Sequence, residues 1–186
     1  VSFGGSQSNA ILRELFRSEA LTEAFIRDAL TGARAQNLTG FNFDLEPFGT
    51  GADGWFDDAA AFFRRFTAAM HAEDLTVGWD SNGPEGVSLD VDSWMDMPTY
   101  YGPGPGFKAD LIKGMYAVGA ERYAYGLCPT CQILNESQVD MRFAALETGP
   151  GKLVHKMQLF SFYGMGTQPP NGWEHYWKGM AAWLKG

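Results

Sequence analysis

The chain contains the stretch LTGFNFDLEP at residues 38–47, in which bulky apolar residues alternate with polar ones. An alternation of period two is typical of a β-strand whose two faces differ. The apolar face receives Phe41, Phe43 and Leu45, and the polar face receives Asn42, Asp44 and Glu46. Pro47 cannot donate a hydrogen bond to a neighbouring strand, so it ends the run. The stretch predicts a strand with an amide and two carboxylates on one face, at its carboxyl end.

The two carboxylates need a physical explanation, because burying a charge without a partner is costly. Like charges two residues apart oppose each other's ionisation, which favours a carboxylic acid that keeps its proton near neutral pH. This is the property of a general acid with a helper. A purely structural interpretation stays open, in which Asp44 and Glu46 are solvated or form salt bridges.

The stretch resembles the signature strand of glycoside hydrolase family 18, in which Asp-Gly-x-Asp-x-Asp-x-Glu closes the fourth strand of a (β/α)8 barrel. Gly40 matches the glycine, Asp44 takes the third acidic position and Glu46 the position of the general acid. Thr39 and Asn42 stand where the family has its first two acids. The resemblance therefore retains the two acids that matter most for the chemistry.

A second match lies at the start of the chain, where Val1 to Gly5 read VSFGG. This resembles the Ser-x-Gly-Gly motif at the end of the family's third strand. Glycines at such a place let the backbone approach a ligand closely, so Gly4 and Gly5 are candidate substrate-binding residues. The motif alone is weak, but its spacing to the acidic strand, with one long helix between, strengthens it.

The resemblance implies a retaining, substrate-assisted hydrolysis of β-1,4-linked N-acetylglucosamine, in chitin or in an N-glycan core. Glu46 would protonate the leaving oxygen and later activate water, and Asp44 would orient the acetamido group of the sugar. Asn42 can hydrogen-bond to Asp44 but cannot share a proton with it. This substitution puts the family's usual pH cycling in doubt, though not the first chemical step.

Further candidates lie near the ends of later strands. The family's Met-x-Tyr-Asp motif is replaced by MPTYY at residues 97–101, so Tyr100, with Tyr101 close behind, is expected to support the acetamido group. Trp79 and Asp80 are expected on the catalytic rim, where an aromatic face can stack on a sugar. Phe160 is expected as a weaker floor where the family usually has a tryptophan. Core packing is the alternative for each aromatic residue.

Predicted strands and helices alternate along the chain, which is the pattern of parallel βα units. Besides the opening residues, strands are expected at 38–46, 75–80, 91–101, 123–127 and 154–163, and helices at 18–36, 55–70, 109–118, 136–146 and 173–184. The expected fold is α/β, a (β/α)8 TIM-barrel type that is incomplete, in one domain spanning 1–186. A closed barrel takes about 250 residues and eight strands, and the resemblance covers only the third to eighth units. Three explanations fit the missing units: an amino-terminal part absent from this sequence, a partner chain that completes the barrel, or a degenerate fold. We favour the first.

Composition narrows the possible partners. The chain has 186 residues and a formal net charge of −8, which argues against nucleic acid and anionic membranes. No apolar run approaches the roughly 18 to 20 residues of a membrane span, and no signal-peptide pattern is visible. A neutral polysaccharide or glycan is indifferent to the charge. No His-Glu-x-x-His or Gly-x-Ser-x-Gly pattern occurs, so we expect neither a metal site nor a cofactor.

The two cysteines, Cys128 and Cys131, form a Cys-x-x-Cys after a late predicted strand. A small loop disulfide is the first interpretation, free thiols the second and redox chemistry the third. Asn37 and Asn135 begin N-glycosylation sequons, which matter only in a secreted eukaryotic chain. Together these features favour an extracellular setting or the secretory pathway.

Two functions are compatible with these sequence features. The first is a chitinase-like glycosidase, favoured by the intact Asp44 and Glu46. The second is a catalytically weak or inactive relative that binds glycan as a lectin or builds an extracellular assembly. Thr39, Asn42, the altered sixth strand and the missing first two units favour this alternative.

Overall fold

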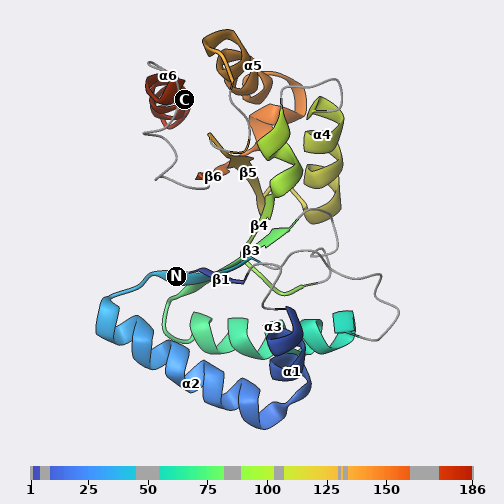
Figure 1. The fold of residues 1–186 in the computed structure, drawn as a ribbon, viewed down its shortest axis with the longest axis vertical. Helices are drawn as coiled ribbons and strands as arrows, with labels where there is room; N and C mark the ends of the chain where they lie inside the picture. The colour runs from blue at the N-terminus through green and yellow to red at the C-terminus, as the bar shows by residue number, and fades with distance from the viewer. Residues whose placement is uncertain are drawn as a thin grey trace. The chain divides into compact units, whose positions relative to one another are not determined.

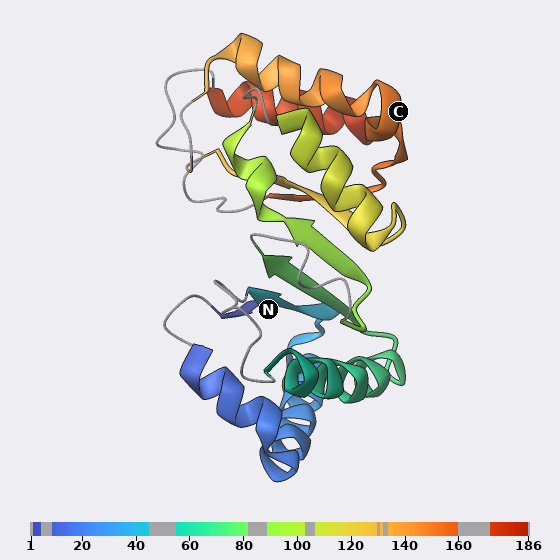
Figure 2. The same ribbon diagram turned by 90° about the vertical axis from the view of Figure 1, so that its right-hand side faces the viewer.

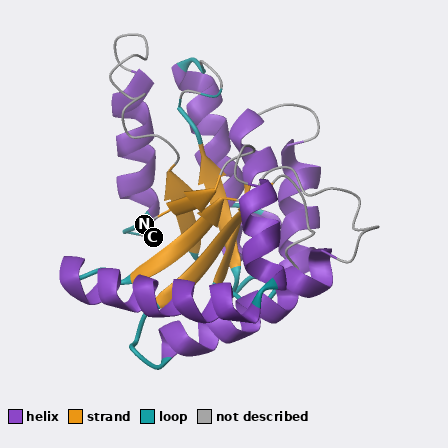
Figure 3. Cartoon of the chain, turned by 60° about the horizontal axis from the view of Figure 1, so that its bottom comes forward, coloured by secondary structure: helices purple, strands orange, loops and turns teal. Residues whose placement is uncertain are grey.

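The computed structural model describes residues 2–4, 9–44, 55–81, 89–102, 107–129, 131, 134–159 and 172–185. These residues form the helices and strands that Figure 3 colours purple and orange. The strands are β1 (Ser2–Gly4), β2 (Gly40–Asp44), β3 (Thr76–Ser81), β4 (Ser93–Asp96), β5 (Tyr123–Leu127) and β6 (Lys156–Leu159). The α-helices are α1 (Asn9–Arg17), α2 (Glu19–Gln36), α3 (Trp55–His71), α4 (Phe107–Val118), α5 (Glu136–Leu146) and α6 (Gly172–Trp183). Two 3₁₀ helices, η3 (Met97–Tyr101) and η4 (Gly149–Leu153), complete the described elements.

The strand order in the sheet is that of the chain, β1 to β6. The pairs β1–β2, β2–β3 and β5–β6 are parallel, with Phe41 opposite Val77 and Tyr125 opposite Met157. Sequential parallel strands joined by helices make an α/β fold of the TIM-barrel type. The described residues contribute six strands, against eight in a closed barrel. The predicted fold class and its incompleteness are confirmed.

The element predictions agree with the structure except in two places. α1 was not among the predicted helices, whereas the helix expected at 18–36 is α2, which begins after Ser18, whose hydroxyl accepts a hydrogen bond from the Leu21 amide. The predicted strand at 91–101 is shorter, because η3 begins at Met97. Pro98 has no amide hydrogen to give to a strand ladder and suits the first turn of a helix.

The chain divides into two compact units, unit 1 (Val1–Trp94) and unit 2 (Met95–Gly186). The expectation of a single domain stays a prediction. In unit 1, α2 and α3 lie against the sheet (Figures 1 and 2). Their core is aromatic: the Phe43 ring lies 4.9 Å from that of Phe63 and 5.2 Å from that of Phe66. Each such pair adds about 0.5–1.5 kcal/mol beyond area burial.

In unit 2, α5 and α6 lie side by side (Figure 2), and the core contains polar groups. The hydroxyl of buried Tyr123 donates to a carboxylate oxygen of buried Asp96, at 3.1 Å. α5 begins with a capping box. The Asn135 side chain accepts a hydrogen bond from the Gln138 backbone amide, and the Gln138 side chain accepts one from the Asn135 backbone amide. Across the described ranges, no helix has the length and apolar character that crossing a membrane requires.

Candidate active site

The two faces of β2 separate apolar from polar side chains, as the alternation predicts. Phe41 and Phe43 are buried and contact rings of α2 and α3. Asn42 and Asp44 are half-buried and alternate with them, so they point to the face of the strand opposite the helices. The acid of β2 that the structure describes therefore faces away from the helical layer.

The carboxyl ends of three neighbouring strands bring further groups to this place. Asp44 is the last residue of β2, and its partners in the ladder are Gly4 of β1 and Asp80 of β3. Asp80 is only 5% exposed. One oxygen of each of the two carboxylates is inaccessible to solvent. Side chains at such strand ends are where a TIM-barrel fold places its chemistry, so we call Asn42, Asp44 and Asp80 the acidic cluster.

Within the acidic cluster, one hydrogen bond joins the strands. The side-chain amide of Asn42 donates to Oδ2 of Asp80 at 2.5 Å. Gly78, the ladder partner of Asn42, makes room for this contact, because a Cβ there would overlap Oδ1 of Asn42 and lie 3.0 Å from the Ser93 hydroxyl. The alternation of residues along β2 does not reveal this arrangement. A glycine two residues before Asp80 was the available signal, since both share one face of β3.

Trp79, predicted to contact substrate, lies in the core. Its side chain is fully buried, and its ring lies 5.0 Å from that of Phe63 in α3. It alternates with Gly78 and Asp80 and so occupies the helical face of β3. The structure therefore favours the core alternative for Trp79, while its neighbour Asp80 points to the acidic cluster.

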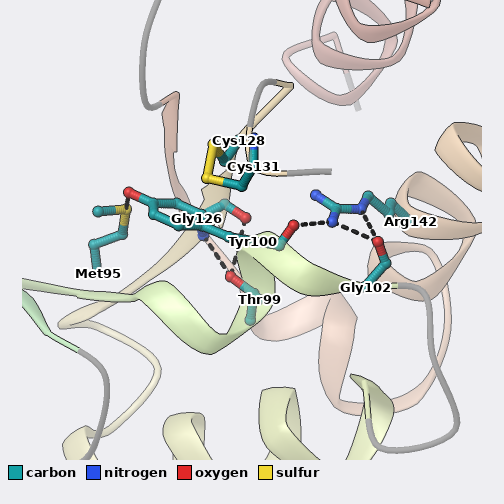
Figure 4. The surroundings of a disulfide bond; sticks show 8 residues. All are labelled: Met95, Thr99, Tyr100, Gly102, Gly126, Cys128, Cys131 and Arg142. Carbon is teal, nitrogen blue, oxygen red and sulfur yellow. Dashed lines mark hydrogen bonds between the residues drawn. A yellow bond between two sulfur atoms is a disulfide. The ribbon is translucent and has the colours of Figure 1, made fainter. Parts of the chain in front are cut away.

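The two tyrosines of η3 differ in exposure. Tyr100 is buried, and its hydroxyl donates to the sulfur of Met95 at 3.1 Å (Figure 4). Tyr101 is 60% exposed. Gly126 leaves room for the Tyr100 ring, since a Cβ at position 126 would lie 2.8 Å from its Cε1. Support of an acetamido group by either residue stays a prediction.

Arg142 of α5 holds the backbone after Tyr100. Its side chain is fully buried and donates to the carbonyl oxygens of Tyr100 and Gly102, the latter at 2.8 Å from Nε (Figure 4). Arg142 was not among the predicted site residues, although an arginine beside the apolar Val139 and Phe143 of the helix was a signal. Burial raises the pKa of the nearby Tyr125 hydroxyl, and the charge of Arg142 opposes that rise.

The Cys-x-x-Cys and the sequons have clear positions. Cys128 and Cys131 are joined by a disulfide, and Cys128 lies in the buried cluster of unit 2 that also contains Tyr100 (Figure 4). The first interpretation of the cysteines is therefore the one that the structure contains. Asn37 ends α2 in a left-handed conformation and Asn135 caps α5; both are exposed. Their glycosylation stays a prediction.

Three predicted site residues, Gly5, Glu46 and Phe160, lie outside the described residues. The role expected of Glu46 stays a prediction from the sequence pattern. Among the residues whose placement is described, no group of histidine, cysteine or acidic side chains could hold a metal ion.

Comparison with known proteins gives a fold. The chain matches no protein-family model and no curated protein sequence. Among solved structures, a chitinase from Chromobacterium violaceum superimposes with a TM-score of 0.68 at 14% identity, covering 97% of this chain and 78% of the other. A class V chitinase from Pseudomonas fluorescens gives a TM-score of 0.67 at 14% identity, covering 92% and 75%. A sporulation-specific glycosylase from Bacillus subtilis superimposes with a TM-score of 0.54 at 14% sequence identity, covering 68% of this chain and 50% of the other. The fold is therefore chitinase-like.

Proposed function

We propose that this chain is a glycoside hydrolase that cleaves β-1,4-linked N-acetylglucosamine in chitin or an N-glycan core. The observation that carries the proposal is the position of Asp44, at the carboxyl end of β2 and on the face opposite the helices. The chitinase-like fold supports it, because such barrels place their catalytic groups at this end of the strands.

The proposed mechanism is substrate-assisted and retaining, as in the family that residues 39–46 resemble. Glu46 gives its proton to the glycosidic oxygen while the acetamido oxygen of the sugar attacks the anomeric carbon, which breaks the glycosidic bond. The product of this step is a cyclic oxazolinium cation. The carboxylate of Asp44 orients the acetamido group and stabilises the positive charge. Glu46, now ionised, takes a proton from the water that opens the ring and restores the β-configuration.

The alternative function is binding of glycan without turnover, as a lectin or a structural component. Two observations favour it: the ring of Trp79 lies in the core of unit 1, and the hydroxyl of Tyr100 is bonded to Met95. Neither side chain is therefore displayed for a sugar in the described conformation. Asn42 adds to this alternative, because an amide cannot hold the proton that a carboxyl would share.

The test is hydrolysis of a fluorogenic chito-oligosaccharide by the full-length protein and by its Glu46→Gln variant. Loss of the general acid should lower kcat by roughly 10² to 10⁴-fold. The matched control is Asp28→Asn, because Asp28 lies on α2 with a side chain that is 77% exposed. Asp28→Asn should hydrolyse the substrate at the rate of the parent.

The same experiment separates the alternatives. A parent that binds the oligosaccharide in calorimetry without turning it over would establish the lectin. A parent that neither binds nor hydrolyses it would leave a structural role. Equal rates for the parent and Glu46→Gln would refute the mechanism.

We also propose an extracellular setting or the secretory pathway for this protein. The Cys128–Cys131 disulfide supports it, because such bonds persist in oxidising compartments.

A further inference from the structure

The side chain of Asn42 forms a hydrogen bond with Asp80, which gives position 42 a structural role. Its amide donates at 2.5 Å across the ladder to the carboxylate of the neighbouring strand. A carboxylate that is 5% exposed is stable only with donors that compensate for its lost hydration. The amide of Asn42 supplies such a donor, and Gly78 leaves the space in which it lies.

The fixed carboxylate lies beside Asp44. Asp44 and Asp80 are partners in the parallel ladder and point to the same face. Like charges on directly neighbouring strand positions repel each other. A negative charge held still at position 80 therefore disfavours conformations in which the Asp44 carboxylate turns toward β3. The conformations that remain turn it away from β3.

We propose, on the basis of the function proposed above, that Asp80 is a positioning residue for Asp44 and that Asn42 is the group that anchors it. The acid that β2 lacks at position 42 is thus supplied from β3. Asp80 acts through Asp44 and does not touch the sugar. Position 42 is the preceding residue on Asp44's own face of β2, whereas Asp80 lies opposite Asp44 on the neighbouring strand.

A positioning role for Asp80 predicts different effects on kcat and on KM. In Asp80→Asn the repulsion is lost and a new amide can bond to Asp44 and pull it toward β3. We expect kcat to fall on the order of 10- to 10²-fold, because small misplacements of a reacting group have effects of this size. KM should stay within about twofold, since ground-state contacts with the sugar are unchanged. Asn42→Ala, which loses the anchor and keeps the charge, should lower kcat less.

An exchange variant gives a second readout that does not depend on one substitution being tolerated. Asn42→Asp alone places two carboxylates at hydrogen-bond distance and should reduce kcat and stability together. Combining Asn42→Asp with Asp80→Asn restores an amide–carboxylate pair in reverse. The double variant should therefore regain the stability that Asn42→Asp loses, but kcat should stay low because position 80 carries no charge opposite Asp44. Thermal unfolding of each variant, and the activity of Asp28→Asn as control, separate this from a loss of folding.

The outcomes are distinct from those of the proposed function. An active parent whose kcat is unchanged by Asp80→Asn would overturn this inference and leave the hydrolase intact. A raised KM with unchanged kcat would overturn it in favour of direct substrate contact. An inactive parent would overturn both. A selective fall in kcat in Asp80→Asn that persists in the exchange variant, while the exchange variant recovers stability, would establish it.

Discussion

The two units differ in what lies on the face of their strands opposite the helices. In unit 1 this face carries the acidic cluster of β2 and β3. In unit 2, Arg142 of α5 and Tyr176 of α6 lie near enough to Tyr125 to affect its pKa, which places Tyr125 on the helical face and its neighbours in β5 on the other. There they join an apolar cluster of Met95, Met97, Tyr100, Ala124 and Cys128. One unit thus presents groups suited to acid chemistry, and the other a packed surface.

The two units also differ in their aromatic residues. Of the fourteen phenylalanines, ten lie in residues 1–94, and all seven tyrosines lie in residues 95–186. The core of unit 1 is therefore free of hydroxyl groups from tyrosine, whereas that of unit 2 must satisfy several. The same βα pattern can therefore bury polar side chains on either face of a sheet, provided that each buried polar group has a hydrogen-bond partner.

The largest effect in unit 2 is expected from Arg142→Met. Its guanidinium is the donor to the carbonyl oxygens of Tyr100 and Gly102, and an unsatisfied buried acceptor costs about 1–3 kcal/mol. The free energy of unfolding, measured by urea denaturation, should fall by about 3 kcal/mol. Lys113→Met, an exposed position of α4, should leave it nearly unchanged. Equal stabilities would show that the buried cation of unit 2 is dispensable.

An intermediate effect is expected from the glycine that each unit places against a key side chain. Gly126→Ala crowds the Tyr100 ring and the Asp96 carbonyl oxygen, which lies 3.0 Å from the added Cβ, so it should destabilise by about 1–3 kcal/mol. In unit 1, Gly78→Ala should displace the Asn42 side chain and so lower the kcat for hydrolysis of the chito-oligosaccharide.

The control for both is Gly32→Ala in α2, where the added Cβ meets nothing within 4 Å. A helix gains roughly 0.5–1 kcal/mol from this change. If all three variants behaved alike in denaturation and kinetics, close packing at positions 78 and 126 would not matter.

The smallest effect concerns alkaline pH and belongs to unit 2. Burial raises the pKa of Tyr125 above its ordinary value, so the neutral hydroxyl is favoured in the folded state. The resulting stability is fully present below about pH 10, the ordinary value, and is lost as pH rises toward the folded pKa. Burial likewise raises the pKa of Tyr176. Stability should decline above pH 10 by about 1.4 kcal/mol per pH unit for each such group.

Tyr125→Phe should make this decline shallower, and Tyr116→Phe, at a side chain that is 81% exposed, should not. Melting temperatures between pH 8 and pH 11 would measure both. A decline of equal slope in both variants would place the alkaline sensitivity elsewhere.

Much of the architecture could be predicted from local pattern. Period-two alternation in residues 40–44 established the strand and its two faces, and the apolar spacing of residues 55–70 established α3. The Ser18 cap marked the start of α2. These features depend on neighbours a few residues apart, which a sequence displays directly. α1 was not predicted, because its nine residues are shorter than the window over which a helical period becomes evident.

The sequence by itself determined the class of fold and the face on which Asp44 lies. Only the tertiary structure decided what surrounds that acid. Asn42 and Asp80 are 38 residues apart, and their hydrogen bond follows from the register of two parallel strands, which no local pattern records. Trp79 and Asp80 are adjacent in the chain yet lie on opposite faces of β3, one in an aromatic core and the other in the acidic cluster. The physical reason is that a residue's chemistry depends on its partners, and partners distant in the chain are chosen by strand pairing and packing.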